Sequence, residues 1–399
     1  MSNRWRDVAA GLFAVAWGAN QFVSMIVAYR IHRGISTATN DGLFGSYAVA
    51  LIIALLLGGP AADLWGRRVV VRPAVVTSLL ATVLLMAGQD SVPLLYAGRV
   101  AAGLASGAIF AAGTAWVKEL SASSSAAGAR RAALALTLGF GLGPLVTGIV
   151  AQWAPDPLVL AYVPHLLIAA AALPLVWRAP ETVVPEPGGP SFAARLRVPA
   201  AGQRRFLRVV APAAPWVFGA PSVAFAVLPS LVSDHLHGYA VVFSAVMAAT
   251  TLGTGVLVQP FARRLDGPGR LDAMLLGLAA TVVGTLVGVL AAVHGNPLLA
   301  LVATVPLGAG YGMGLVSGLL ETQRLAAADE LAGLTAVYYA LTYVGFALPL
   351  LLAELDGLAG YPVLLLGVAG LALLSLLAVL SARGVQPGVL RSESAAELK

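Results

Sequence analysis

The sequence contains no cysteine and few charged residues, and both shortages limit the classes of protein to which it can belong. Because the 399 residues include 0 Cys, disulfides, thiolate metal sites and cysteine nucleophiles are excluded. Charged residues make up 11% of the chain and hydrophobic residues 59%, whereas a soluble protein has about 25% charged residues. This composition indicates a protein that crosses a membrane many times.

Long hydrophilic stretches are also missing, so the sequence leaves no room for a separate soluble domain. At about 20 apolar residues per crossing, the length allows twelve helices with short loops, and we predict an all-α polytopic membrane protein. The first apolar run is long enough to span, and we interpret it as a retained helix and not as a signal peptide. The apolar runs predict helices near 8–29, 42–62, 69–88, 93–117, 131–152, 158–177, 209–232, 239–261, 272–293, 297–319, 332–353 and 361–381.

The basic residues are distributed unevenly between the two sides of this arrangement. All 24 Lys and Arg residues except Arg30, Arg33 and Arg99 fall on the side of the N-terminus. By the positive-inside rule, both termini are expected in the cytoplasm, with a bacterial inner membrane as the default location. The net charge of +6 is dispersed over helix ends and not gathered on one face, which argues against a nucleic-acid partner.

A short charged segment separates the second and third predicted helices. Two glycines allow the backbone to turn tightly there, and an acid and two arginines stand where a helix would leave the hydrocarbon. The spacing G-x-x-x-D-x-x-G-R-R resembles the loop between helices 2 and 3 of the major facilitator superfamily of secondary transporters. On this resemblance we expect a gating loop, whereas a purely topological anchor would explain only the arginines. Its residues are Gly59, Asp63, Gly66, Arg67 and Arg68.

The resemblance implies two pseudo-symmetric six-helix bundles that alternate access to a central site. A Pro/Gly-rich stretch divides the predicted helices six and six, as such a transporter requires. Gly103, Gly107 and Gly113 recur as Gly308, Gly312 and Gly318 at an offset of 205, which supports two repeats. The expected domains are an N-terminal bundle at 1–178, a cytoplasmic linker at 179–208, a C-terminal bundle at 209–382 and a cytoplasmic tail at 383–399.

The fifth predicted helix carries a second motif, Gly139-x-x-x-Gly143-Pro144-x-x-x-Gly148. Glycines permit close packing of helices, and the proline bends the helix because it removes a backbone hydrogen bond. The segment is similar to the G-x-x-x-G-P-x-x-G-G motif that the family associates with antiporters, most often exporters. A generic kinked membrane helix is the alternative interpretation.

Two ionisable residues are candidates for proton coupling. Arg99 lies inside the fourth predicted helix, where a charge is costly and is expected to face the bundle interior. Its surroundings resemble the family pattern in which an arginine is followed four residues later by glycine, here Gly103, although an arginine that snorkels to the membrane surface is the alternative. Asp41 is the acid nearest to a helix interior, with a solvated loop aspartate as its alternative. We interpret the loop that contains Asp234, His235 and His237 as solvent-exposed and not as a cation-binding site.

Polar residues of the first helix, predicted near mid-membrane, and aromatic or polar residues on other helices are candidates for a substrate cavity. One face of the first helix is polar at i, i+3, i+4 and i+7, and it either lines the cavity or bonds to a neighbouring helix. Aromatic residues on other helices extend this candidate site, although most single aromatics are packing residues. The candidates are Trp17, Asn20, Gln21, Ser24, Tyr47, Phe110, Thr114, Phe225, Tyr311, Tyr338, Tyr339 and Tyr343.

We therefore predict a secondary active transporter. The first hypothesis for its function is proton-coupled export of small amphipathic or hydrophobic compounds. An importer or facilitator of a small neutral solute is the alternative within transport, and a membrane receptor is the alternative outside it. The sequence shows no paired carboxylates, metal-ligand cluster or Ser/His/Asp arrangement at one membrane depth, so we expect no enzyme activity, cofactor or metal. The expected partners are a small-molecule substrate, protons and the lipid bilayer, with the chain monomeric.

Overall fold

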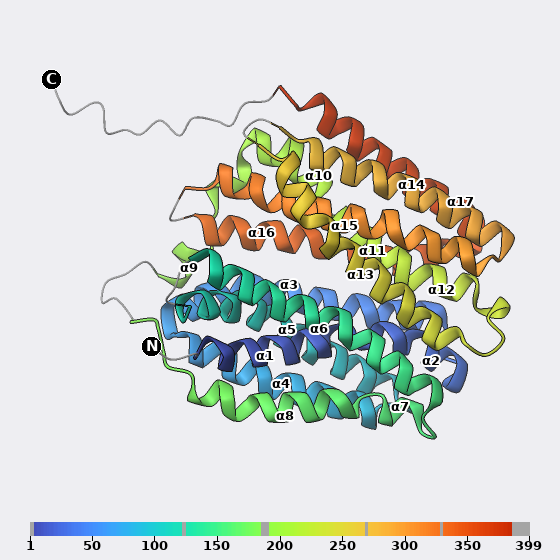
Figure 1. Ribbon diagram of the computed structural model, residues 1–399, viewed down its shortest axis with the longest axis horizontal. Helices are drawn as coiled ribbons and strands as arrows, with labels where there is room; N and C mark the ends of the chain where they lie inside the picture. The colour runs from blue at the N-terminus through green and yellow to red at the C-terminus, as the bar shows by residue number, and fades with distance from the viewer. Residues whose placement is uncertain (1–3, 122–124, 185–190, 268–269, 328–329, 385–399) are drawn as a thin grey trace.

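The computed structural model of the chain describes residues 4–121, 125–184, 191–267, 270–327 and 330–384 (Figure 1). In this part of the chain every regular element is helical, apart from one isolated bridge between Gly267 and Arg270. The α-helices are α1 (Trp5–Asn20), α2 (Phe22–Arg33), α3 (Thr37–Trp65), α4 (Arg67–Ala87), α5 (Val92–Glu119), α6 (Ser125–Trp153), α7 (Pro157–Leu160), α8 (Val163–Arg178), α9 (Phe192–Arg195), α10 (Ala211–Ala213), α11 (Trp216–Ser222), α12 (Leu228–Leu231), α13 (Ala240–Leu265), α14 (Asp272–His294), α15 (Pro297–Leu325), α16 (Leu331–Tyr343) and α17 (Leu348–Ser381). Five further helical segments, of 3-10 or π type, are η1 (Pro199–Gly202), η2 (Phe206–Val210), η3 (Val223–Val227), η4 (Ser233–His235) and η5 (Val344–Ala347).

The helices have the length and composition of membrane spans, which confirms the predicted fold class. Among the described residues, 11 helical segments are long and apolar enough to cross a membrane. The last of them, Leu331–Ser381, has 51 residues and would be about 77 Å long as a straight helix, against about 30 Å of hydrocarbon. Gly360 interrupts it with φ 68° and ψ 150°, a conformation that L side chains rarely adopt. The segment therefore holds two crossings, which gives twelve in the described part of the chain.

Two spans are less regular than the apolar runs predict. The first predicted helix is divided by a turn at Gln21 into α1 and α2. The span Phe206–Leu231 alternates between α-helix and the π-helical segments η2 and η3. Hydropathy measures only how apolar a run of residues is. It therefore does not reveal where the hydrogen-bond pattern of a helix changes, for example near a proline, which lacks the backbone N–H donor.

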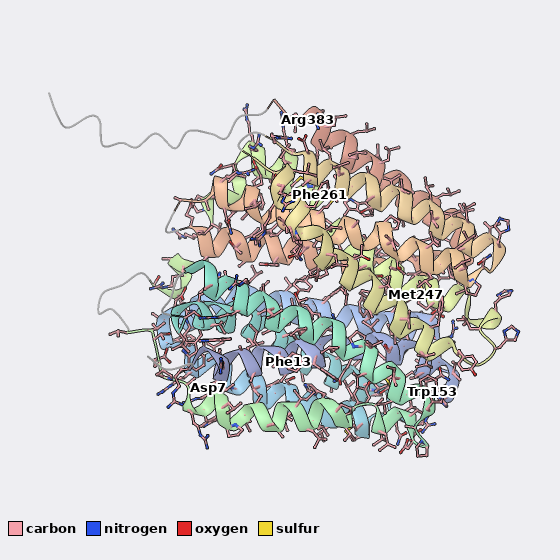
Figure 2. The ribbon with its side chains drawn as sticks, viewed as in Figure 1. Asp7, Phe13, Trp153, Met247, Phe261 and Arg383 are labelled. Atoms are coloured by element: carbon pink, nitrogen blue, oxygen red, sulfur yellow. The ribbon has the colours of Figure 1, made fainter. Side chains whose placement is uncertain are left out.

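Figure 1 shows the helices in two groups, with α1–α8 in the lower group and α10–α17 in the upper one. We call these the N-bundle and the C-bundle. The proximal end is the end at which α1 begins and α17 ends, and the distal end is the opposite one, where α2 ends. Asp7 and Trp153, labelled in Figure 2, lie toward the proximal and distal ends of the N-bundle.

Equivalent glycines allow close helix crossings in both bundles. A Cβ added at Gly103 or Gly107 of α5 would overlap backbone oxygens of α3, at Tyr47 and Leu51. In the C-bundle, a Cβ at Gly308 of α15 would overlap the carbonyl of Thr251 on α13 in the same way, and Gly312 meets the carbonyl of Gly255. The repeat inferred from glycine spacing therefore corresponds to the same helix crossing in the two halves. The third pair differs, because Gly113 faces Ile109 whereas Gly318 faces Tyr338.

We expect Gly312→Ala to reduce thermal stability, because backbone cannot withdraw from the added methyl group. Overpacking of this kind costs about 1–3 kcal/mol, more than alanine gains in helix propensity. The matched control is Gly253→Ala on α13, where an added Cβ meets nothing within 4 Å. Thermal unfolding of the detergent-solubilised variants, followed by size-exclusion fluorescence, measures both changes. Equal unfolding temperatures for the Gly312→Ala and Gly253→Ala variants would contradict the close crossing.

Candidate functional site

Aromatic side chains from both bundles meet where α3 packs against the C-bundle. The ring centroid of Phe44 lies 6.3 Å from that of Phe225 and 4.7 Å from that of Phe346, and Tyr47 lies 6.5 Å from Phe346. Phe218 continues the contact inside the C-bundle, stacked on Tyr343 with centroids 4.5 Å apart. We call the seven residues of this group the aromatic cluster. They are Phe44, Tyr47, Phe218, Phe225, Tyr311, Tyr343 and Phe346.

The aromatic cluster unites four of the residues proposed from the sequence for a cavity, namely Tyr47, Phe225, Tyr311 and Tyr343. Phe44, Phe218 and Phe346 were not among the sequence candidates. Helical spacing carries a signal for them, because Phe44 lies three residues before Tyr47, Phe346 three after Tyr343 and Phe218 seven before Phe225. Each therefore shares a helical face with a candidate.

Arg99 of α5 is fully buried beside this cluster. Its guanidinium carbon lies 4.3 Å from the centroid of the Phe22 ring and 4.4 Å from that of Tyr47, so two aromatic rings flank the charge. Nε donates a hydrogen bond of 3.2 Å to the carbonyl of Leu43. Nη1 and Nη2 have no hydrogen-bond partner among the described residues. Arg99 thus points into the bundle and does not snorkel to the surface.

Asp41, the other candidate for proton coupling, is buried near the distal end of α3. One carboxylate oxygen, Oδ1, has no hydrogen-bond partner in the described structure. Arg30 of the N-bundle and Tyr361 of the C-bundle are near enough to interact with it electrostatically. Asp41 therefore lies where the two bundles meet, and not in a solvated loop.

Polar contacts join the bundles at the distal end. Arg30 donates to the hydroxyl of Ser233 at 2.5 Å and to the carbonyl of Ser230 at 3.4 Å. Gln152 donates to the carbonyl of Gly238 at 2.9 Å and accepts from the backbone N–H of Val242 at 3.1 Å. In Figure 1 the two groups of helices converge toward this end, where α6 and α13 approach each other.

The glycines of the predicted antiporter motif lie against α1, α2 and α13. A Cβ added at Gly139 would be 2.6 Å from the carbonyl oxygen of Phe13, and one at Gly143 would be 2.7 Å from that of Trp17. Gly148 lies against Ala245 of the C-bundle, so its small size serves the contact between bundles. The carbonyl of Pro144 accepts a 2.7 Å hydrogen bond from Ser24. The motif thus brings α6 close to helices of both bundles.

The gating loop forms an ion cluster at the proximal end of the N-bundle. The guanidinium of Arg67 lies 2.6 Å from Asp63 and donates to Glu119, at the end of α5, at 2.7 Å from Nη2 and 3.2 Å from Nε. Gly66 has φ 103°, which favours glycine between α3 and α4. Gly59, by contrast, has ordinary van der Waals space for a Cβ. Sequence reasoning found the loop but missed Glu119, because only the fold brings the end of α5 beside it.

The segment that follows α8 is bonded to the same loop. The carboxylate of Glu181 accepts from the backbone N–H groups of Arg67 and Arg68 at 2.9 Å each, and from those of Thr182 and Val183. Burial acts to raise the pKa of Glu181, but these backbone hydrogen bonds outweigh burial and lower the pKa below its ordinary value. Arg68 also donates to the carbonyl of Ala179. The beginning of the linker is thereby fixed to the N-terminus of α4.

We expect Glu181→Gln to lower thermal stability at neutral pH and to have little effect in acid. A carboxyl group whose pKa is lowered by folding stabilises the folded state above its ordinary pKa, and this contribution is lost as pH falls through the lowered value. The difference in unfolding temperature between wild type and variant should therefore begin to shrink below about pH 4.3, the ordinary pKa of a glutamate, and should disappear once the pH lies below the lowered pKa. Asp90→Asn, which breaks an exposed pair with Arg33, is the control. An undiminished difference in acid would show that charge is not involved.

The C-bundle has its own buried ion cluster at the proximal end, which the sequence did not predict. Arg205, before η2, donates to Glu321 of α15, and both side chains are buried. Arg324 also contacts Glu321 at 3.1 Å and lies 3.8 Å from Asp266. Burial raises the pKa of Asp266 to about 6, although Arg324 opposes this. Glu321 was not predicted as a buried charge because it lies near the end of an apolar helix, where the sequence resembles a solvated turn.

The four residues of the polar face predicted on the first helix lie in different environments. Trp17 is buried, Asn20 is partly exposed, and Ser24 bonds to α6. Gln21 is turned into the N-bundle, where it donates to Thr82 at 3.1 Å. Thr82 in turn contacts Nδ1 of His165 at 2.8 Å. The helix break at Gln21 and this buried network were not evident from helical periodicity.

The remaining candidates lie outside the aromatic cluster. Phe110 packs on Phe140 of α6, and Thr114 bonds to the carbonyl of Phe110. Tyr338 donates to two carbonyls of α15 inside the C-bundle, and Tyr339 is only partly buried beside it. The loop residues Asp234, His235 and His237 are all exposed.

Comparisons with known proteins agree with this architecture. The family model of the Major Facilitator Superfamily matches residues 8–348. A solved POT family transporter in complex with 5-aminolevulinic acid is 13% identical, with a TM-score of 0.78 over 95% of this chain and 96% of that one. The nucleoside transporter NupG is 11% identical, with a TM-score of 0.71 over 95% and 99% of the two chains. The human organic anion transporter MFSD10 (TETRAN) is 19% identical, with a TM-score of 0.62 over 95% and 100%.

No curated protein matches the chain by sequence. At identities below 20%, the solved structures establish only the fold and give no information on substrate. The family model, in contrast, covers most of the chain. The chain therefore belongs to the Major Facilitator Superfamily and is a multi-pass membrane transporter, not an enzyme.

Proposed function

We propose that the protein is a proton-coupled exporter of small amphipathic or hydrophobic compounds that works by alternating access. The observation that carries this proposal is the aromatic cluster, which joins the two bundles at Phe44, Phe225 and Phe346. An apolar cargo inserted among these rings would gain contacts from both bundles at once. Its binding would then be coupled to their relative orientation.

The protein is proposed to be closed at its distal end and accessible from its proximal end in this structure. The support is the set of hydrogen bonds that Arg30 and Gln152 make across the distal interface. With both termini assigned to the cytoplasm by the distribution of basic residues, this is the conformation that loads cargo from the cytoplasm. We place the protein in a bacterial inner membrane, as a monomer with the domain boundaries expected above.

Asp41 is proposed as the proton carrier. A buried ionised carboxylate without direct partners is costly, whereas the protonated group is neutral. Opening of the distal end would separate Arg30 from Ser230 and Ser233 and expose Asp41 to water, where it ionises. Proton uptake from that side would neutralise Asp41 and favour closure, so proton entry accompanies the return of the empty transporter.

The direction of transport rests on the antiporter-like motif of α6. Gly143 and Gly148 seat α6 against α1 and against Ala245 of α13, so this helix can seal the passage between the bundles while they move. A tight seal is what exchange of substrate for protons requires, because a leak would dissipate the gradient. The ion cluster of Asp63, Arg67 and Glu119 is proposed to hold the gating loop within the N-bundle in the state described here.

Alternating access can be tested directly because the natural chain has 0 Cys. We would introduce Gln152→Cys with Val242→Cys, whose native groups are bonded across the distal interface. Oxidative cross-linking should abolish transport in proteoliposomes, and reduction should restore it. Each single cysteine variant is the control and should be insensitive to oxidant. Full transport by the cross-linked protein would contradict alternating access through the distal end.

A further inference from the structure

The aromatic cluster borders a positive charge that no described carboxylate neutralises. Arg99 is fully buried, and its guanidinium retains the proton even in apolar surroundings. Its Nη1 and Nη2 groups carry N–H donors that no described residue accepts. Burial of such donors is costly, and membrane proteins keep buried charges where they serve a site.

Neither of two acids of the N-bundle, Asp41 and Glu119, forms an ion pair with Arg99 in the described structure. Asp41 interacts electrostatically with Arg30 but has no direct cationic partner among the described residues, and Glu119 is bonded to Arg67. Across the described part of the chain, no ion pair involves Arg99. The guanidinium of Arg99 therefore contributes a positive potential at the N-bundle side of the aromatic cluster, and no described ion pair neutralises it.

Tyr47 transmits this potential to the cluster. One face of its ring is covered by the guanidinium, 4.4 Å from the centroid, and the ring of Phe346 in the C-bundle lies 6.5 Å away. The guanidinium already interacts with the π-electrons of the Tyr47 ring, so a second cation stacked on that ring gains less cation–π attraction. The positive charge of Arg99 also repels it. An uncharged aromatic compound escapes this repulsion, and an anion is attracted.

We propose that the cargo is an uncharged or anionic aromatic compound and that lipophilic cations are disfavoured. This inference rests on the proposed function, because it takes the aromatic cluster as the substrate site. Arg99 is then the specificity-determining residue. It acts on the charge of the cargo through Tyr47 and is distinct from Asp41, the proposed proton carrier.

Three naphthalene compounds of similar size but different charge test this inference. They are 1-naphthoate, 1-naphthylmethanol and 1-naphthylmethylammonium, with binding to the purified transporter measured by calorimetry and movement measured in proteoliposomes. We expect the anion and the alcohol to bind about tenfold more tightly than the ammonium compound, a free-energy difference of about 1.4 kcal/mol. Arg99→Gln should remove this preference, and Arg99→Lys should retain it. Arg33→Gln, at an exposed distal arginine, should change nothing.

The possible outcomes distinguish a failure of this inference from a failure of the proposed function. Equal or tighter binding of the ammonium compound to the wild type would overturn the inference and leave the exporter proposal standing, and this comparison needs no folded variant. An unchanged preference in Arg99→Gln would remove Arg99 as its cause. If the reconstituted wild type neither binds nor moves any of the three compounds, the proposed function fails together with the inference.

Discussion

Replacing Asp41 with asparagine should strongly reduce transport driven by a pH gradient while substrate binding persists. The amide resembles the protonated carboxyl group in size and charge, so the distal end should still close over it. It cannot release a proton, however, and the variant cannot couple proton entry to cargo exit. We expect the initial rate of pH-driven movement to fall about tenfold or more, which corresponds to a barrier higher by about 1.4 kcal/mol or more. Exchange of labelled for unlabelled substrate at equal pH should continue.

The matched control is Asp234→Asn. Asp234 is also an acid at the distal end, but it is exposed and contacts only the neighbouring hydroxyl of Ser233 among the bonds described. Its replacement should leave both pH-driven movement and exchange near wild-type rates. Normal pH-driven transport by Asp41→Asn would assign proton coupling to another group.

The second large effect is expected at the gating loop, where Asp63→Asn should slow transport without impairing membrane insertion. Asp63 holds Arg67 at 2.6 Å, and Glu119 holds the same guanidinium from α5. Loss of one anion alters the relative free energies of the conformations that this loop stabilises. A change of about 1.4 kcal/mol in that difference changes the ratio of their populations tenfold. The predicted result is an initial rate about tenfold lower at equal expression.

Asp7→Asn serves as the control for this variant. Asp7 is an acid at the same end of the same bundle and pairs with the exposed Arg4 at 3.4 Å. It makes no described contact with the gating loop, so its replacement should be neutral. Equal rates for Asp63→Asn and wild type would reduce the loop to a topological anchor.

The number and order of crossings follow from the sequence because apolar length is dictated by bilayer thickness. Hydropathy also located the interruption near Gly360, where α17 turns. It did not anticipate the turn at Gln21 or the π-helical segments η2 and η3. Those features depend on which backbone groups neighbouring helices can satisfy, and this is decided by packing and not by composition.

The candidate site could be predicted only in part. Tyr47 and Tyr343 were predicted as aromatic candidates for the cavity, but their partners Phe44 and Phe346 become evident only once α3 and η5 are in contact. The partners of charged groups were the least accessible to sequence reasoning. Arg67 pairs with Glu119, 52 residues further along the chain, and no local pattern specifies such a distance.

Gln21 shows the opposite difficulty. Helical periodicity places it with Trp17 on one polar face, yet the structure turns it toward Thr82 and His165 inside the N-bundle. A buried amide bonds to the nearest available polar group, and periodicity alone does not distinguish a cavity from the interior of a bundle.

The most direct test of proton-coupled export is simultaneous measurement of substrate and proton movement in proteoliposomes containing the wild-type protein. The account predicts that an imposed pH gradient drives substrate against the direction of proton flow, and that added substrate causes proton movement that Asp41→Asn lacks. Substrate movement without any accompanying proton flux in the wild type would contradict it.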